Sequence, residues 1–126
     1  MQVPEDLHYT DEHEWIREIA DKLVRIGITD YAQDQLGDVV YVELPEVGKQ
    51  VAKDDLLAEI ESTKSVGEVY APFSGTVVSV NDAVAASPEL VNASPYVDGW
   101  LVEIEVDGDV STDGLLDAAA YKDLTE

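Results

Sequence analysis

The feature that most constrains the fold of this chain is a short polar stretch between two apolar runs. Residues 56–60 form the first run, Ser62 to Ser65 form the polar stretch, and residues 66–72 form the second run. Two strand-like runs joined by a few polar residues are typical of a β-hairpin. The pattern therefore predicts a hairpin with Lys64 at its tip, where its amine would be exposed on a rigid element.

A lysine at such a tip has two interpretations. Polar residues are common in tight turns whether or not they have a function. A lysine held by two paired strands also suits covalent attachment of a cofactor, because the cofactor could swing into water while its root stays fixed. Short motifs match by chance too often to decide between these interpretations on this stretch alone.

The rest of the 126 residues predicts more short strands, small helices and turns. We expect strands at 13–17, 23–28, 38–44, 50–52, 76–80 and 100–106, and a helix at 31–36 that Thr29 and Asp30 cap and Gly37 ends. Residues 81–95 predict a longer connection with one helical turn. Thr112 and Asp113 predict the cap of a terminal helix with Leu116, Ala120 and Leu124 on one face. This is the pattern of a single mainly β domain, 1–126, arranged as a sandwich or barrel with peripheral helices and a C-terminal helix.

The composition argues against several classes of partner. There are 28 acidic residues against 7 lysines and arginines, a formal net charge of −21. Such a chain repels nucleic acid and anionic membranes, whereas a partner with a basic rim would be attracted. A surface kept acidic for solubility, or for a high-salt cytoplasm, explains the charge equally well. With no membrane span or signal peptide in the sequence, we expect a cytoplasmic monomer.

We find no catalytic motif. The absence of cysteine excludes disulfides and thiolate chemistry, and it also suits a carrier of a reactive dithiol, because no internal thiol could attack it. His8 and His13 are the only histidines and lack the spacing of a metal site. The sequence predicts structural roles for Trp15 and Trp100. We therefore expect a protein that is not an enzyme and has neither catalytic nor metal-binding residues.

A small β domain with a lysine on a hairpin tip resembles the biotinyl and lipoyl carrier domains, which are barrel-sandwich hybrids of short strands. Biotin acceptors have methionine on both sides of the lysine, whereas Lys64 lies between Thr63 and Ser65. Lipoyl acceptors have an acid three residues before the lysine and a glycine eleven residues after it. In this chain Glu61 and Gly75 occupy these two positions relative to Lys64. The resemblance favours lipoate and implies that Glu61 and Gly75 serve recognition by the lipoylating enzyme. The alternative is that Gly75 only forms a turn and has no part in recognition.

Motifs along nearly the whole chain resemble the H proteins of the glycine cleavage system. They are His13-Glu14-Trp15, the segments 27–33, 36–40 and 42–45, Glu61-Ser62-Thr63-Lys64-Ser65, Tyr70-Ala71-Pro72, Ser74-Gly75, the run 90–96 and Gly99-Trp100. The resemblance implies that Lys64 carries lipoate in amide linkage. The carrier would take the aminomethyl group of glycine from the pyridoxal-phosphate glycine decarboxylase to the tetrahydrofolate-dependent aminomethyltransferase. Dihydrolipoamide dehydrogenase would then reoxidise the dithiol.

The resemblance also implies that the loaded arm shelters in a groove of the carrier, where acids would attract its amine. Glu14 and Glu68 occupy the places of those acids, although aspartate is more usual at the position of Glu68. The alternative is that Glu14 and Glu68 are ordinary exposed acids without a role at the arm. Two other functions stay open, namely a lipoate depot without a role in glycine cleavage, and an unmodified adaptor or small enzyme for which Lys64 would be dispensable.

Overall fold

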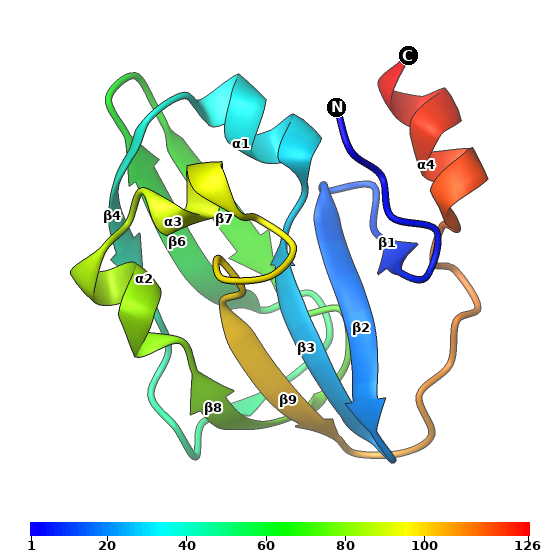
Figure 1. The fold of residues 1–126 in the computed structure, drawn as a ribbon. Helices are drawn as coiled ribbons and strands as arrows, with labels where there is room; N and C mark the ends of the chain where they lie inside the picture. Colours follow the sequence, from blue (N-terminus) through cyan, green and yellow to red (C-terminus); the bar gives the residue numbers. More distant parts are fainter.

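The computed structural model describes residues 1–126 and contains two antiparallel sheets with small helices around them (Figure 1). The strands are β1 (His8–Tyr9), β2 (Glu14–Ala20), β3 (Leu23–Ile28), β4 (Val39–Glu43), β5 (Gln50–Val51), β6 (Leu56–Ser62), β7 (Val66–Tyr70), β8 (Gly75–Val80) and β9 (Val102–Val106). The helices are α1 (Asp30–Leu36), α2 (Asp82–Ala86), α3 (Leu90–Ala93) and α4 (Ala118–Thr125).

The main core lies between the two sheets. One sheet has the order β1-β2-β3-β9-β8-β5 and the other has the order β4-β6-β7. Alternate residues of the strands point inward, as a half-exposed antiparallel sheet requires, and Val24, Ile26, Ile60, Val77 and Ile104 are fully buried. The prediction of a mainly β sandwich of short strands with peripheral helices is confirmed.

A second, aromatic core fixes α4 against the first strands. The rings of Tyr9 and Tyr121 stack at 4.6 Å, and Trp15 is fully buried with its indole N–H donating to the Pro95 carbonyl at 2.9 Å. Trp100 packs against this core and lies under the Arg25 guanidinium, 4.7 Å from the ring centroid. The packing roles predicted for both tryptophans are confirmed.

The terminal helix begins later than predicted. Leu116 exchanges backbone hydrogen bonds with Tyr9 in an isolated bridge, so the chain is extended there and cannot be helical. Asp117 is the N-cap, and its carboxylate accepts from the Ala120 N–H at 2.8 Å. The predicted cap at Thr112 and Asp113 is therefore wrong, and so is the predicted face, because Ala118 and Tyr121 are buried whereas Leu124 is 49% exposed. Residues 81–95 hold two short helices rather than one turn.

The predicted hairpin is present as β6 and β7. Their register pairs Glu61 with Val66 and Ile60 with Gly67, which leaves Thr63 to Ser65 as the connecting turn. The hairpin projects from the molecule beside α1 (Figure 1). The predicted α1 is also found, with Thr29 as its N-cap and Gly37, at φ +82°, as its C-cap.

Candidate functional site

Local hydrogen bonds hold the root of Lys64 in place. The Ser62 hydroxyl accepts from the backbone N–H groups of Ser65 at 3.0 Å and of Lys64 at 3.3 Å. The Ser62 N–H donates to the Ser65 carbonyl at 2.8 Å, and the Thr63 N–H donates to the Asp38 carbonyl at 3.1 Å. The tip is therefore tied both to itself and to the segment that leads into β4. Lys64 is exposed, and no ion pair engages its amine.

The side chain of Lys64 lies across Gly37 at the end of α1. A Cβ added to Gly37 would stand 3.2 Å from Cε of Lys64 and 3.7 Å from Cδ. Glycine thus serves twice at this position, since it adopts the positive φ of the helix cap and leaves room for the lysine stem. The stem leads from the hairpin tip to the end of α1.

Asn92, on α3, fixes this end of α1. Its side-chain amide donates to the Gly37 carbonyl at 2.9 Å and to the Gln33 side chain at 3.0 Å, and its oxygen accepts from the Val39 N–H at 2.8 Å. Sequence reasoning gave Asn92 no role. Its partners lie more than fifty residues away, so no local pattern could have revealed them.

A groove of about 310 Å³ runs between α1 and the edge strand β7. Its apolar lining comprises Ile28, Tyr31, Ala32, Leu36, Ile60 and Val69, and its polar lining comprises Glu12, His13, Gln35 and Glu68. Leu36 comes directly before Gly37 and packs on β7 because Gly67 leaves the space, where an added Cβ would lie 3.1 Å from Leu36 Cδ2. The groove therefore begins one residue from the backbone that the Lys64 stem crosses.

The C-terminal helix supports one wall of the groove through His13. The ring of His13 bonds to the Tyr121 hydroxyl at 2.8 Å and packs on the Tyr31 ring at 4.7 Å. Thr29, also buried, bonds to the same Tyr121 hydroxyl at 2.7 Å. Burial lowers the pKa of His13 below its ordinary value, although the nearby charges of Glu12 and Asp11 oppose this. These contacts give His13 a structural role in the wall of the groove.

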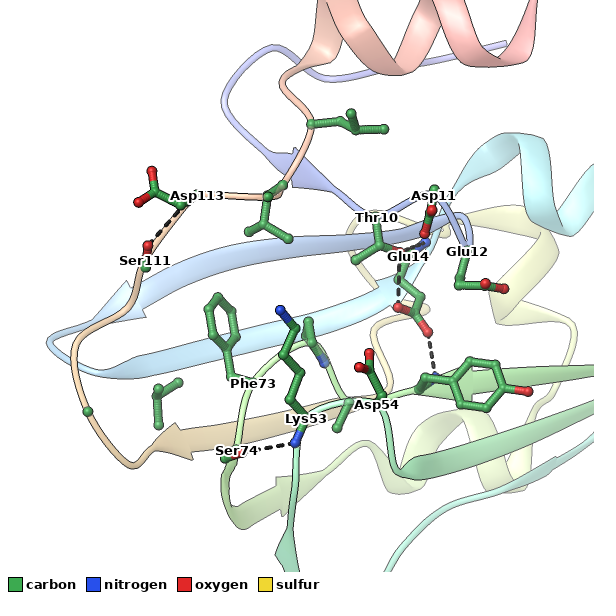
Figure 2. A pocket seen from close by; sticks show the side chains of 18 of the residues that line it. Thr10, Asp11, Glu12, Glu14, Lys53, Asp54, Phe73, Ser74, Ser111 and Asp113 are labelled. Carbon is green, nitrogen blue, oxygen red and sulfur yellow. Dashed lines mark hydrogen bonds between the residues drawn. The ribbon is translucent and has the colours of Figure 1, made fainter.

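A second and larger depression, of about 680 Å³, opens beside Glu14 (Figure 2). Its lining is strongly acidic, with Lys53 as the only cation and the acids Asp11, Glu12, Glu14, Asp54, Asp107, Asp109 and Asp113. Lys64 lines neither depression, and Glu12 lines both. Of the two depressions, the smaller one begins near the lysine.

Glu14 is a buried carboxylate rather than a surface acid. It is 2% exposed and accepts hydrogen bonds from the Thr10 hydroxyl at 3.0 Å and from the Tyr70 backbone N–H (Figure 2). Burial raises its pKa from 4.5 to about 7, even though both hydrogen bonds act to lower it. Glu14 thus joins the start of β2 to the end of β7.

The other predicted site residues lie in different surroundings. Glu68 is exposed and lines the groove. Glu61 is exposed on the outer face of the β4-β6-β7 sheet, paired with Tyr41 and Val66. Gly75 is buried at the start of β8, paired with Val51 and Val106. The structure therefore brings Glu68 to the groove near Lys64, and it places Glu14 in the neighbouring depression.

Comparisons with known proteins agree over almost the whole chain. The family model described as glycine cleavage H-protein matches residues 7–126. The glycine cleavage system H protein of Mycobacteroides abscessus is 50% identical, covering 99% of this chain and 98% of that protein. That of Mycolicibacterium smegmatis is 53% identical, covering 96% and 95%. A crystal structure of a glycine cleavage system H protein from Mycobacterium marinum superposes with a TM-score of 0.86 at 40% identity, covering 96% and 97%. The chain belongs to the glycine cleavage H-protein family.

Membership of the H-protein family confirms two of the predictions. The chain is a carrier subunit of the glycine cleavage system rather than an enzyme, and the barrel-sandwich fold is the one its structural relative adopts. H proteins carry lipoate, and they work with the other components of their system. No helix of this chain is long and apolar enough to cross a membrane.

Glu14 gives the stability of this H protein a pH dependence of definite sign. Its folded-state pKa of about 7 exceeds the ordinary value of 4.5, so the folded protein holds the proton more tightly than the unfolded chain does. This contribution to stability is fully present below pH 4.5 and is lost as the pH rises through about 7. A shift of this size corresponds to at most about 3 kcal/mol.

We expect Glu14→Gln to remove most of this dependence, because glutamine can accept from the Tyr70 N–H and donate to the Thr10 hydroxyl without carrying a charge. The free energy of unfolding in urea, measured from pH 5 to pH 8, should fall less in the variant than in the wild type, by about 2 kcal/mol. The matched control is Glu46→Gln, because Glu46 is exposed and takes no part in the contacts that shift the pKa of Glu14; its slope should equal that of the wild type. Equal slopes for Glu14→Gln and the wild type would show that Glu14 titrates normally.

Proposed function

We propose that this chain is the lipoyl carrier of the glycine cleavage system, a single carrier domain over residues 1–126 that bears lipoate in amide linkage on Lys64. The observation that carries the proposal is the course of the Lys64 side chain. It leaves a rigid hairpin tip, crosses Gly37 and leads toward a groove with an apolar floor and acidic residues. An extension of this side chain would find a place to lie on the protein's own surface.

The residues of the site fit an extended acyl arm. The apolar side chains of the groove, among them Leu36, Ala32 and Val69, suit the hydrocarbon chain of lipoate. The Lys64 amine is free to be acylated, and acylation removes its charge. When bound, lipoate supplies a disulfide that can receive the aminomethyl group of glycine.

Acidic residues in the groove suit an arm that ends in an amine. Glu12 and Glu68 line it, and neither has a lysine or arginine within 4 Å. Each carboxylate contact with an ammonium group contributes about 1.5–3 kcal/mol when it is shielded from water. Glu14 is buried next to the same region, and its bond to the Tyr70 N–H fixes the end of the strand that carries Glu68. We assign Glu68 to direct contact with the loaded arm, and Glu14 to contact or to positioning of β7.

Three enzymes act on the carrier in this proposal, in the cytoplasm. Glycine decarboxylase loads it, the aminomethyltransferase unloads it, and dihydrolipoamide dehydrogenase reoxidises the dithiol. A fourth enzyme attaches the lipoate, and Glu61 and Gly75 belong to the surface and the folded framework that it recognises. The carrier itself is monomeric and meets each enzyme in turn.

The experiment that tests the proposal is the intact mass of the protein from lipoate-replete cells, followed by peptide mapping around Lys64. A single lipoyl increment on Lys64 is expected. The lipoylated protein should then support decarboxylation of glycine by purified glycine decarboxylase. An unmodified Lys64 would overturn the proposal, and a lipoylated protein that the decarboxylase cannot load would favour the depot function.

A further inference from the structure

The helix α1 forms one wall of the groove, but little within the helix fixes it there. It has seven residues, and none of them is buried. Isolated helices this short are not stable in water. Among its side chains, only Ala32 and Leu36 pack against the core, and both are only partly buried. The position of this wall therefore depends on contacts at the two ends of the helix.

The start of α1 is held by several groups. The Thr29 hydroxyl bonds to the Tyr121 hydroxyl at 2.7 Å, and the Thr29 N–H donates to the His13 carbonyl at 3.1 Å. The Asp30 N–H donates to the Tyr96 hydroxyl at 3.0 Å. These partners come from three separate segments of the chain, so the loss of one contact leaves the others in place.

The end of α1 depends on a single side chain. All side-chain hydrogen bonds that reach its last turn and cap from elsewhere in the chain come from Asn92. The amide of Asn92 donates to the Gly37 carbonyl at 2.9 Å and to the Gln33 side chain at 3.0 Å, and its oxygen accepts from the Val39 N–H at 2.8 Å. One side chain therefore connects α1, its C-cap and the first residue of β4.

The backbone that Asn92 holds is the backbone beside which the arm begins. A Cβ on Gly37 would lie 3.2 Å from Cε of Lys64, and Leu36, the preceding residue, packs over Gly67 on β7. A shift of this backbone would change both the surface under the lysine stem and the beginning of the groove. No residue of α1 belongs to the buried core, so such a shift would leave the two sheets intact.

We propose that Asn92 is a positioning residue for the loaded lipoyl arm. By holding the end of α1 it keeps the groove in the shape that receives the arm, and so keeps the amine of the arm near Glu68. Asn92 acts through Gly37 and makes no hydrogen bond to Lys64. The inference rests on the proposed function and gives the short helix α3 a part in it.

A loaded arm that leaves the groove is exposed to water. Water can then release the one-carbon unit without any oxidant or reductant. The carbon–sulfur bond breaks, the carbon takes up the oxygen of water, and formaldehyde, ammonium and the lipoyl thiol are formed. Weaker positioning of the arm should therefore appear as faster spontaneous loss of the one-carbon unit.

The first measurement needs no lipoate. Hydrogen–deuterium exchange of the unmodified protein reports on the end of α1, because the Gly37 N–H bonds to the Gln33 carbonyl at 3.0 Å. In Asn92→Ala we expect the Gly37 amide to exchange about tenfold faster or more, because the removed hydrogen bonds held this turn. The Val77 amide, in the core strand β8, should exchange at the wild-type rate.

Asn81→Ala is the matched control. Asn81 also makes three side-chain hydrogen bonds, since it donates to the carbonyls of Asp98 and Trp100 and accepts from the Ala83 N–H. It does not line the groove. Urea unfolding should show a comparable loss of stability for the two variants, whereas Asn81→Ala should leave the exchange of the Gly37 amide unchanged.

The second measurement follows the arm itself. Lipoylated protein is loaded by glycine decarboxylase with glycine that carries ¹³C at its methylene carbon, and is then separated from the enzyme. The ¹³C signal of the loaded protein is followed in buffer without tetrahydrofolate. It should decay about tenfold faster in Asn92→Ala than in the wild type, whereas the rate for Asn81→Ala should stay within about twofold.

Asn92→Asp provides a second variant in case Asn92→Ala does not fold. Aspartate still accepts from the Val39 N–H, but its carboxylate cannot donate to the Gly37 carbonyl. We therefore expect faster exchange of the Gly37 amide and faster decay of the ¹³C signal in this variant too.

Three results would overturn the proposal. The first is a wild-type rate of ¹³C decay in the Asn92 variants, which would leave Asn92 with a role in the fold alone. The second is an equal acceleration in Asn81→Ala, which would assign the effect to general destabilisation. The third is faster decay without faster exchange of the Gly37 amide. In all three the wild type is loaded, so the carrier function survives. A wild type that cannot be lipoylated or loaded would instead remove the carrier function and the role of Asn92 together.

Discussion

Lys64→Arg is expected to abolish glycine cleavage supported by this chain, to below the detection limit, while the protein folds normally. Arginine keeps the positive charge, but its guanidinium stays protonated and cannot be acylated. The side chain at this position is exposed and makes no ion pair, so its replacement leaves the fold intact. The measurements are the mass of the protein after incubation with a lipoate–protein ligase, and the exchange of labelled carbon dioxide into glycine with the decarboxylase.

Lys53→Arg is the matched control for this experiment. Lys53 follows β5 and lines the acidic depression rather than the groove. The control should be lipoylated and loaded at the wild-type rate, and both variants should unfold at the wild-type urea concentration. Full activity of Lys64→Arg would contradict every lipoyl function considered for this chain and would favour an unmodified adaptor.

Gly75→Ala is expected to destabilise the fold by about 3 kcal/mol or more, at the upper end of the cost of overpacking. An added Cβ would lie 2.2 Å from the Glu105 carbonyl oxygen and 2.7 Å from Ile104 Cγ2. The oxygen belongs to the backbone of β9, so it cannot turn away as a flexible side chain would, and β8 and β9 would have to separate. Urea unfolding measures the loss.

Gly108→Ala is the control, because nothing lies within 4 Å of a Cβ at Gly108; its free energy of unfolding should change by less than about 0.5 kcal/mol. Gly75 requires no positive φ, so its importance comes from the close approach of β9 rather than from turn geometry. If Gly75→Ala unfolded at the wild-type urea concentration but reacted slowly with the ligase, Gly75 would act in recognition alone.

Local patterns predicted the elements that depend on local chemistry. The hairpin around Lys64 followed from two apolar runs with polar residues between them, and α1 followed from the cap at Thr29 and the glycine at 37. The start of α4 was missed because Tyr9, more than a hundred residues earlier, pairs with Leu116 and keeps it extended. The local sequence that predicts a helix contains no information about a strand partner so far away in the chain.

The candidate site was predictable only in part for the same reason. Lys64 and Glu68 belong to one hairpin and could be placed from their neighbours in sequence. The groove forms only where α1 packs against β7. The backbone that the Lys64 side chain crosses is held by the hydrogen bond from the Asn92 side chain to the Gly37 carbonyl. The burial of Glu14 depends on the Tyr70 N–H, 56 residues along the chain. A sequence dense in acids gives no sign of which one is buried.

The bond from His13 to Tyr121 also sets an order of events during synthesis. The two residues are 108 positions apart, so a nascent chain that already displays the hairpin has no Tyr121 to brace His13 until α4 has been translated. Contacts between such distant positions are among the slowest to form. The wall of the groove that contains His13 is therefore completed late. If Lys64 were acylated before that point, its arm would lie beside a groove in which His13 does not yet have its hydrogen bond to Tyr121.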